Sequence, residues 1–228
     1  MHRSAMSNAK LFFDTYSASA PSWKVLDIGS QDVNGSLREV CPKGVEYLGV
    51  DFVKAKGVDV VLTDPYHFPF EDNFADMVVS SSCFEHSEMF WVLFLEILRV
   101  LKPQGVFYLN VPSNGVFHRY PVDCWRFFPD SGQALVNWAK LSGYPSAALL
   151  ESYTSYQDTE VFNDFVAIFI KDDQFQTAFP KRILHSLTAF SNGRVSGNAE
   201  ILNLKTFPED LLKLQAIQQI AAGKITIR

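Results

Sequence analysis

Cysteine is scarce in this sequence, and the way it is scattered excludes two classes of protein. The 228 residues include 3 cysteines, Cys41, Cys83 and Cys124, which lie far apart and form no C-x-x-C pair. Such a set builds neither a disulfide framework nor a zinc site and fits a reducing compartment, so we expect a cytoplasmic protein. No other His, Cys and carboxylate residues have metal-ligand spacing, and no metal is expected.

Basic charge and long apolar runs are also missing. Lys and Arg number 20 against 25 Asp and Glu, a net charge of −5, whereas nucleic-acid binders present a basic surface. DNA is therefore not expected as a partner, and bulk RNA is disfavoured. The apolar runs 11–13 and 90–101 are too short, or too interrupted by charges, for a secretion signal or a membrane span. A composition of 47% hydrophobic and 20% charged residues suits one ordinary globular core.

The most informative stretch is 23–51, which reads as a strand (23–28), a polar turn (29–36), a short helix and a second strand (45–50) ending at Asp51. Parallel strands covered by helices bind ligands at their carboxyl ends, where a helix N-terminus supplies free N–H groups. An acid that closes the second strand can accept both hydroxyls of a ribose. The stretch therefore predicts a nucleoside site.

A missing set of glycines indicates which nucleoside. A dinucleotide turn needs three glycines so that the backbone can approach a pyrophosphate. Only Gly29 is in place, because Gln31 and Val33 stand where further glycines are expected and Gly35 comes too late. S-adenosylmethionine carries no phosphate and needs only one close turn, so this pattern favours it over NAD.

Further strands and helices alternate along the chain. Strand patterns cover 58–62, 76–80, 106–111, 148–153 and 164–171, and helical patterns cover 90–101 and 132–141. This alternation predicts an α/β, Rossmann-like fold with a seven-stranded, mostly parallel sheet and helices on both faces.

One domain with a C-terminal extension is expected. The domain, 1–171, begins with a helix or arm over the sheet edge. The extension, 172–228, is helical, and in it 191–198 forms a loose linker before a final helix (208–222). This extension either caps its own domain or forms a homodimer contact, and the sequence leaves both open.

Five motifs between residues 23 and 171 resemble those of the class I S-adenosylmethionine-dependent methyltransferases, of the methyltransferase type 11 kind. They are VLDIG, YLGVD, FPFEDNFADMVVSS, CFEH and EILRVLKPQG. The resemblance implies a seven-stranded sheet whose last strand is antiparallel, and S-adenosylmethionine as cofactor. The cofactor-binding residues that it implies are Asp27, Gly29, Ser30, Asp51, Phe52, Asp64, Pro65, Ser80 and Ser81.

The resemblance also implies a role for each part of that set. Asp27 and Gly29 would form the turn against the methionine half of the cofactor, with Asp51 on the ribose. Asp64 would face the adenine amino group, and the serines would offer backbone groups near the amino-acid part.

Methyl transfer is an in-line displacement, so such an enzyme mostly positions the acceptor and excludes water, sometimes with a general base. The candidate catalytic residues are His86, His118 and Asp123, which follow predicted strands. We expect the long connection 112–130 to form the acceptor pocket and lid. Two plainer roles stay open: a helix cap for His86, and an ion pair with Arg126 that holds the loop for Asp123.

The expected function is methyl transfer from S-adenosylmethionine to an oxygen or nitrogen of a small, sugar-like molecule. Two other functions stay open. One is a methyltransferase-like binding or scaffold protein without turnover, suggested by the altered turn 30–33. The other is a nicotinamide oxidoreductase, which the missing glycines disfavour.

Overall fold

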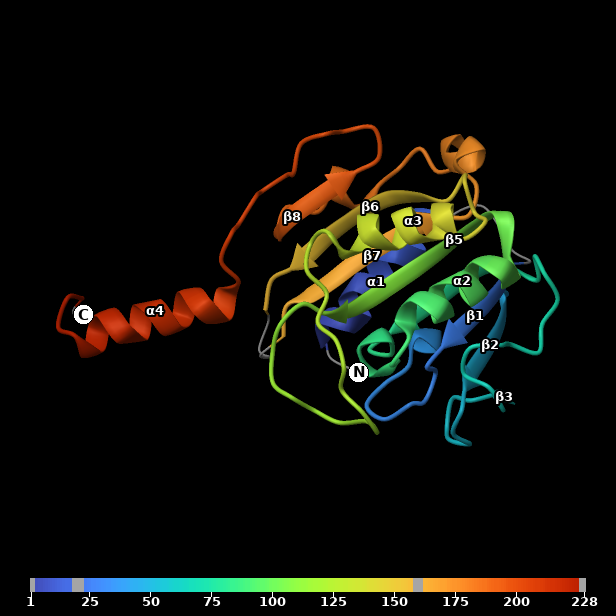
Figure 1. Ribbon diagram of the computed structural model, residues 1–228, viewed down its shortest axis with the longest axis horizontal. Helices are drawn as coiled ribbons and strands as arrows, with labels where there is room; N and C mark the ends of the chain where they lie inside the picture. Colours follow the sequence, from blue (N-terminus) through green and yellow to red (C-terminus); the bar gives the residue numbers. More distant parts are fainter. Residues whose placement is uncertain (1–2, 18–22, 158–161, 226–228) are drawn as a thin grey trace.

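The protein is described by a computed structural model that covers residues 3–17, 23–157 and 162–225. These residues form one eight-stranded sheet in the order β3-β2-β1-β4-β5-β7-β6-β8 (Figure 1). The strands β3-β2-β1-β4-β5 pair in parallel with one another. The pairs β5–β7, β7–β6 and β6–β8 are antiparallel. The predicted Rossmann-like α/β fold is confirmed, with one strand more than the seven expected.

The strands are β1 (Lys24–Ile28), β2 (Glu46–Asp51), β3 (Val60–Val61), β4 (Ala75–Ser81), β5 (Leu101–Pro112), β6 (Ala148–Ser155), β7 (Asp164–Ile170) and β8 (Phe190–Val195). The α-helices are α1 (Arg3–Tyr16), α2 (Phe90–Val100), α3 (Ser131–Leu141) and α4 (Glu209–Ala221). Short 3-10 turns are η1 (Leu37–Glu39), η2 (Phe84–His86), η3 (Asp173–Ala178) and η4 (Ile183–His185). None of the helices within the described ranges is both long and apolar enough to span a bilayer.

Alternation along the strands gives the sheet a separate apolar core on each face. On β5, Phe107 belongs to the core under α2 and α3, while Tyr108 belongs to the core under α1. Figure 1 shows α2 and α3 on one face and α1 on the other. Successive strand residues point to opposite faces, so a strand buried on both sides reads as a continuous apolar run.

Helix α1 packs against the middle of the sheet, whereas the sequence suggested that it lies over an edge. Phe12 is fully buried and stacks on Tyr108 of β5, with ring centroids 4.7 Å apart. Asn8 donates to Asn110 Oδ1 at 2.9 Å, and Ser4 donates to Asp164 Oδ2 at 2.7 Å. These contacts with β5 and β7 anchor the helix over the central strands.

A polar clamp ties α2 to the loop before β4. The Glu96 carboxylate accepts the Phe68 N–H at 2.6 Å and pairs with Arg99 at 2.6 Å. Arg99 in turn donates to the Phe70 carbonyl at 2.9 Å and to Asp72 at 2.8 Å. A buried carboxylate is stable only when paired in this way, so the clamp fixes the loop onto the helix.

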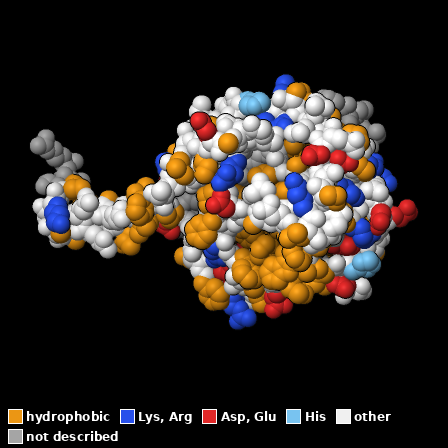
Figure 2. Space-filling view, turned by 45° about the horizontal axis from the view of Figure 1, so that its top comes forward, with side chains coloured by type: hydrophobic (Ala, Val, Ile, Leu, Met, Phe, Trp, Pro, Cys, Tyr) orange, Lys and Arg blue, Asp and Glu red, His pale blue; other side chains and the backbone are white. Residues whose placement is uncertain are grey.

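The extension beyond residue 171 differs from the expectation in one element. Residues 190–195, which overlap the predicted loose linker 191–198, form strand β8 on the outer side of β6. The segment shows no apolar alternation, yet 190–193 are buried and Phe190 belongs to the core under α1. The final helix was predicted and is α4, which projects from the body with apolar side chains on its surface (Figures 1 and 2).

The crossover from β1 to β2 is also shorter than expected. It contains only the single turn η1, capped by Ser36, whose side chain accepts the Arg38 N–H at 3.2 Å. The predicted helix after the turn is therefore reduced to one 3-10 turn.

Candidate functional site

The turn after β1 is packed so tightly that only glycine fits. Gly29 has φ of +81°, and a Cβ placed there would lie 2.6 Å from Cys83 Cβ. The N–H groups of Gly29 and Ser30 both donate to the Val50 carbonyl, at 2.9 and 3.2 Å. The turn thus lies between the end of β2 and the segment after β4, with a bare backbone at the carboxyl edge of the sheet.

Asp51 ends β2 beside this turn. Its side chain is almost buried, and its two carboxylate oxygens face the N–H groups of Gln31 at 3.4 Å and Val53 at 3.1 Å. The next residue, Phe52, exposes about half of its side chain (53%). An acid and an aromatic ring therefore stand together where the sequence predicted a ribose ligand.

Three predicted serines lie around the same turn. Ser80 donates to the Ile28 carbonyl at 2.9 Å and so joins β4 to β1. The hydroxyls of Ser30 and Ser81 are buried and find no hydrogen-bond partner among the described residues. Buried polar groups normally have a partner, so these two hydroxyls fit a site that takes a polar ligand.

Asp27 belongs to the interior of the sheet. Its carboxylate accepts the Tyr47 hydroxyl at 2.6 Å, on the face covered by α1. Burial raises the pKa of Asp27 to about 7, although the Tyr47 hydrogen bond acts in the opposite direction. In this arrangement Asp27 braces β1 against β2.

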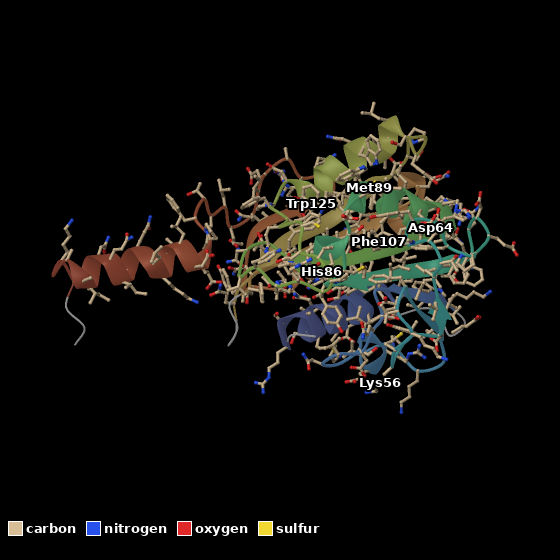
Figure 3. All side chains as sticks on the ribbon, turned by 60° about the horizontal axis from the view of Figure 1, so that its bottom comes forward. Lys56, Asp64, His86, Met89, Phe107 and Trp125 are labelled. Carbon is tan, nitrogen blue, oxygen red and sulfur yellow. The ribbon has the colours of Figure 1, made fainter. Side chains whose placement is uncertain are left out.

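Asp64 and Pro65 lie on an exposed loop. Asp64 accepts the Tyr66 N–H at 2.8 Å, a local turn contact, and Figure 3 shows it well apart from His86. The structure thus groups Gly29 and Asp51 at the carboxyl edge of the sheet, and it places Asp64 on the loop that follows β3, the strand paired with the end of β2.

The long connection after β5 is held together by an ion pair. Both Asp123 oxygens accept from Arg126, at 2.5 and 2.8 Å, and Asp123 also accepts the His118 N–H at 2.7 Å. Arg126 lowers the pKa of Asp123 to about 2. The Trp125 indole donates to the Ser87 carbonyl at 3.0 Å, which anchors the connection to the segment before α2.

Glu85, His86 and His118 meet beneath this connection. His86 Nε2 lies 3.6 Å from Glu85 Oε1, and the two histidine rings stand edge to face with centroids 5.1 Å apart. Burial raises the pKa of Glu85 to about 8 and lowers that of His86. The structure therefore brings together all three predicted catalytic residues, since Asp123 Oδ2 also lies 3.5 Å from His118 Nδ1, with a buried acid between the sheet and the loop.

A small cavity of about 30 Å³ lies at this meeting point. The residues that line it are Ser82, Glu85, Pro112, His118, Phe162 and Asp164. Of these, sequence reasoning selected only His118. Glu85 was within reach, because it stands beside His86 in the CFEH motif, whereas Asp164 and Phe162 come from beyond the loop and carry no local signal.

A larger open groove of about 420 Å³ lies on the outer side of the β1–β2 and β2–β3 connections. Its charged side chains pair with each other: Lys56 with Asp32 at 2.5 Å, and Arg38 with Asp59. Figure 3 shows Lys56 far from His86. None of the predicted site residues lines this groove, so we place the chemistry at the Glu85–His86–His118 cluster beside the smaller cavity.

Residues 26–109 match a family model described as a methyltransferase domain. This range runs from β1 into β5 and contains Gly29, Asp51 and Glu85. The match covers less than half of the chain and, with the parallel sheet and its antiparallel end, supports a methyltransferase domain of class I. S-adenosylmethionine is the cofactor of that class. No curated protein matches the chain.

Solved structures share the fold. The 1,6-didemethyltoxoflavin-N1-methyltransferase of Burkholderia thailandensis, with bound 1,6-didemethyltoxoflavin and S-adenosylhomocysteine, has 16% identity and a TM-score of 0.57 over 74% of this chain and 79% of that one. The [4+2]-cyclase SpnF has 13% identity and a TM-score of 0.54 over 73% and 81%. Because a cyclase also has this fold, the acceptor must be argued from this chain's own residues.

Proposed function

We propose that this chain transfers a methyl group from S-adenosylmethionine to an oxygen or nitrogen of a small, hydroxyl-bearing molecule held under the 112–130 connection. The observation that supports it most directly is the grouping at the carboxyl edge. There, the bare Gly29 turn, the Asp51 carboxylate and the Glu85–His86–His118 cluster follow adjacent strands of one sheet.

The residues at the edge suit the cofactor. Bound there, S-adenosylmethionine would supply a methyl group on a positively charged sulfur. Asp51 would accept the ribose hydroxyls, and the exposed ring of Phe52 would lie beside the adenine. The partnerless hydroxyls of Ser30 and Ser81 would hydrogen-bond its polar groups. Because Gly29 has no side chain, the backbone of this turn would come close to the cofactor.

The acceptor side combines aromatic and polar groups. Phe117 and Tyr120 are largely exposed on the connection, and Trp125 is exposed over about a third of its surface (37%). Flat aromatic faces with nearby hydrogen-bonding groups suit a ring that carries hydroxyls. This composition favours a sugar-like acceptor over a purely apolar one.

In this proposal the three predicted catalytic residues have different parts. His118 lines the cavity, His86 lies beside it, and both would face the acceptor. Asp123 would act through His118, because its oxygens are already engaged by Arg126 and by the His118 backbone. The chain thus orients the acceptor and excludes water, which supplies most of the rate in a displacement of this kind.

Thermal unfolding with S-adenosylhomocysteine tests the cofactor site. At about 100 times its dissociation constant a ligand adds about 2.7 kcal/mol to the free energy of unfolding, which should raise the melting temperature by roughly 5–10 °C. NAD should give no shift. Asp51→Ala should lose the S-adenosylhomocysteine shift, while the control Asp14→Ala, an exposed acid paired with Lys10 on α1, should keep it.

The opposite result is also informative. A wild type that binds neither ligand would refute the proposal and favour the scaffold function. A wild type that binds S-adenosylhomocysteine should then transfer labelled methyl groups to a panel of sugars and other hydroxylated compounds, and His118→Ala should slow that transfer.

A further inference from the structure

Three potential metal ligands converge at the inner end of the 112–130 connection. One ligand atom from each of Glu85, His86 and His118 lies within 4.8 Å of the other two. His86 Nε2 and Glu85 Oε1 are already 3.6 Å apart. Ligands bound tetrahedrally at about 2.0–2.2 Å stand roughly 3.3 Å from each other, so a small approach by His118 completes the set.

Both histidines are held in the orientation that a metal ligand needs. His86 Nδ1 lies 2.5 Å from the Val122 carbonyl, which can only accept, so Nδ1 carries the proton and Nε2 keeps its lone pair. His118 Nδ1 faces two acceptors, the Val116 carbonyl at 3.1 Å and Asp123 Oδ2 at 3.5 Å. Metal-binding histidines are usually fixed in this way, through the other ring nitrogen, by a carbonyl or a carboxylate.

The buried carboxylate of Glu85 has an oxygen that is free to bind a cation. The residue is buried (1% exposed), and its Oε2 finds no hydrogen-bond partner in the described parts of the chain. It lines the cavity of about 30 Å³ together with His118 and Asp164. A cavity of this size holds a water or an ion but no organic acceptor. A metal ion would satisfy the Glu85 oxygen, whose unpaired burial is costly.

The surrounding charge also favours a cation. The carboxylates of Asp123 and Asp164 lie close enough to influence Glu85. Arg126 is the nearby positive charge, with Nη2 3.4 Å from His118 Nδ1, but its guanidinium is engaged by both Asp123 oxygens. Among the described residues that act on Glu85, two carboxylates therefore stand against one guanidinium.

We propose that Glu85, His86 and His118 bind a divalent transition-metal ion of the Zn²⁺ type. Two imidazoles and one carboxylate suit such ions, whereas Mg²⁺ and Ca²⁺ take oxygen ligands. Three protein ligands leave a coordination position open toward the connection. One consequence rests on the proposed methyl transfer: an acceptor hydroxyl bound at the open position would have its pKa lowered, as a metal does for water.

Metal titration of the full chain, without methyl donor or acceptor, tests this site. After chelator treatment the protein should bind one Zn²⁺ or Co²⁺ per chain by calorimetry, and Co²⁺ should give visible absorption bands, while Mg²⁺ should give no comparable binding. Glu85→Gln and His118→Ala should each weaken Zn²⁺ binding by about 100-fold or more, since losing an outer-shell partner alone costs about 10–100-fold.

His67→Ala is the matched control. His67 is exposed and also lies near a carboxylate, 3.7 Å from Glu96, but outside the cluster, so its loss should leave the affinity unchanged. Absence of Zn²⁺ and Co²⁺ binding by the wild type, or equal binding by the His118→Ala variant, would overturn the proposal. Such a failure would leave the cofactor test untouched, because no S-adenosyl compound is present in this titration.

Discussion

Two constraints require glycine at position 29: a left-handed backbone and the lack of space for a Cβ. Gly197 shares only the first constraint, so comparing the two positions separates their costs. Gly29 and Gly197 have nearly the same φ, +81° and +82°, but only Gly29 has neighbours where a Cβ would be. Gly197→Ala should cost about 1–2 kcal/mol for the left-handed backbone alone. Gly29→Ala should cost about 1–3 kcal/mol more, because the added Cβ would overlap Cys83 Cβ, 2.6 Å away. Urea unfolding of both variants measures the difference, and equal costs would contradict the tight packing of the turn.

The buried carboxyl of Asp27 should make stability depend on pH. Its pKa is about 7 in the folded protein against about 3.9 in an unfolded chain, so the folded state holds the proton more tightly. The contribution of the protonated Asp27 to the free energy of unfolding is complete below pH ~4 and is lost as the pH rises through 7. Asp27→Asn should remove this loss, so the free energy of unfolding of the variant should change less between pH 4 and 8.

Denaturant unfolding of wild type and Asp27→Asn across that range measures the effect as a difference between two curves. The wild type should lose up to about 4 kcal/mol relative to the variant. Parallel curves would mean that Asp27 titrates normally in the folded protein.

Single residues were predictable where the chemistry is local. The turn at Gly29 and the acid at Asp51 follow from strand ends and spacing, and the structure places them side by side. Glu85 could not be separated from His86 by sequence alone, because its importance comes from burial and from a histidine on another segment. The absence of metal-ligand spacing in the sequence likewise gave no sign of the cluster that the fold assembles.

On the scale of elements, the apolar face of α1 carries a large share of one core. Phe12→Ala should destabilise the protein by about 3–5 kcal/mol, since a fully buried ring is replaced by a cavity beside Tyr108. Phe128→Ala removes the same ring from an exposed position (65%) and should change stability by no more than about 0.5 kcal/mol. Urea unfolding compares the two. A loss below about 1 kcal/mol for Phe12→Ala would mean that α1 does not pack as described.

Helices and strands whose apolar residues repeat at a regular spacing were predictable from the sequence, and those without such a repeat were not. The three- and four-residue spacing in 90–100 gave α2, and the apolar runs gave β1, β2, β4 and β5 with modest differences at their ends. Strand β8 was missed because its residues, FSNGRV, show no alternation and contain two turn formers. The EILRV motif identified α2, but its Glu96–Arg99 clamp became visible only with the Phe68 loop in place.

For the whole molecule, the projecting helix α4 should contribute little to the stability of the domain. None of its side chains is buried. Its described contacts include two hydrogen bonds that Glu209 accepts, from the Gln157 N–H at 2.8 Å and from Asn163 Nδ2 at 2.5 Å. Removing residues 208–228 should cost no more than about 1–3 kcal/mol and leave ligand binding intact. Collapse of the truncated protein in circular dichroism would show that the helix is part of the core.

The same truncation addresses the predicted homodimer. If α4 packs on a second copy, sedimentation should show a dimer for the full chain and a monomer for the truncated one. A full chain that sediments as a monomer at all concentrations would remove this expectation. The apolar side chains on α4, among them Leu214 and Ile217, make the comparison worthwhile.

The place of α1 against β5 and β7 has a consequence for how the protein is made. The Ser4 hydroxyl bonds to Asp164, 160 residues later in the chain. At about 5–20 residues per second, the ribosome needs roughly 8–30 seconds to deliver that partner after the helix is synthesised. Phe12 and Phe13 lack the β7 part of their core, Val166 and Ile168, for that interval. Helix α1 thus completes its packing long after its own synthesis, and translation speed sets how long part of its apolar face is open to chaperones.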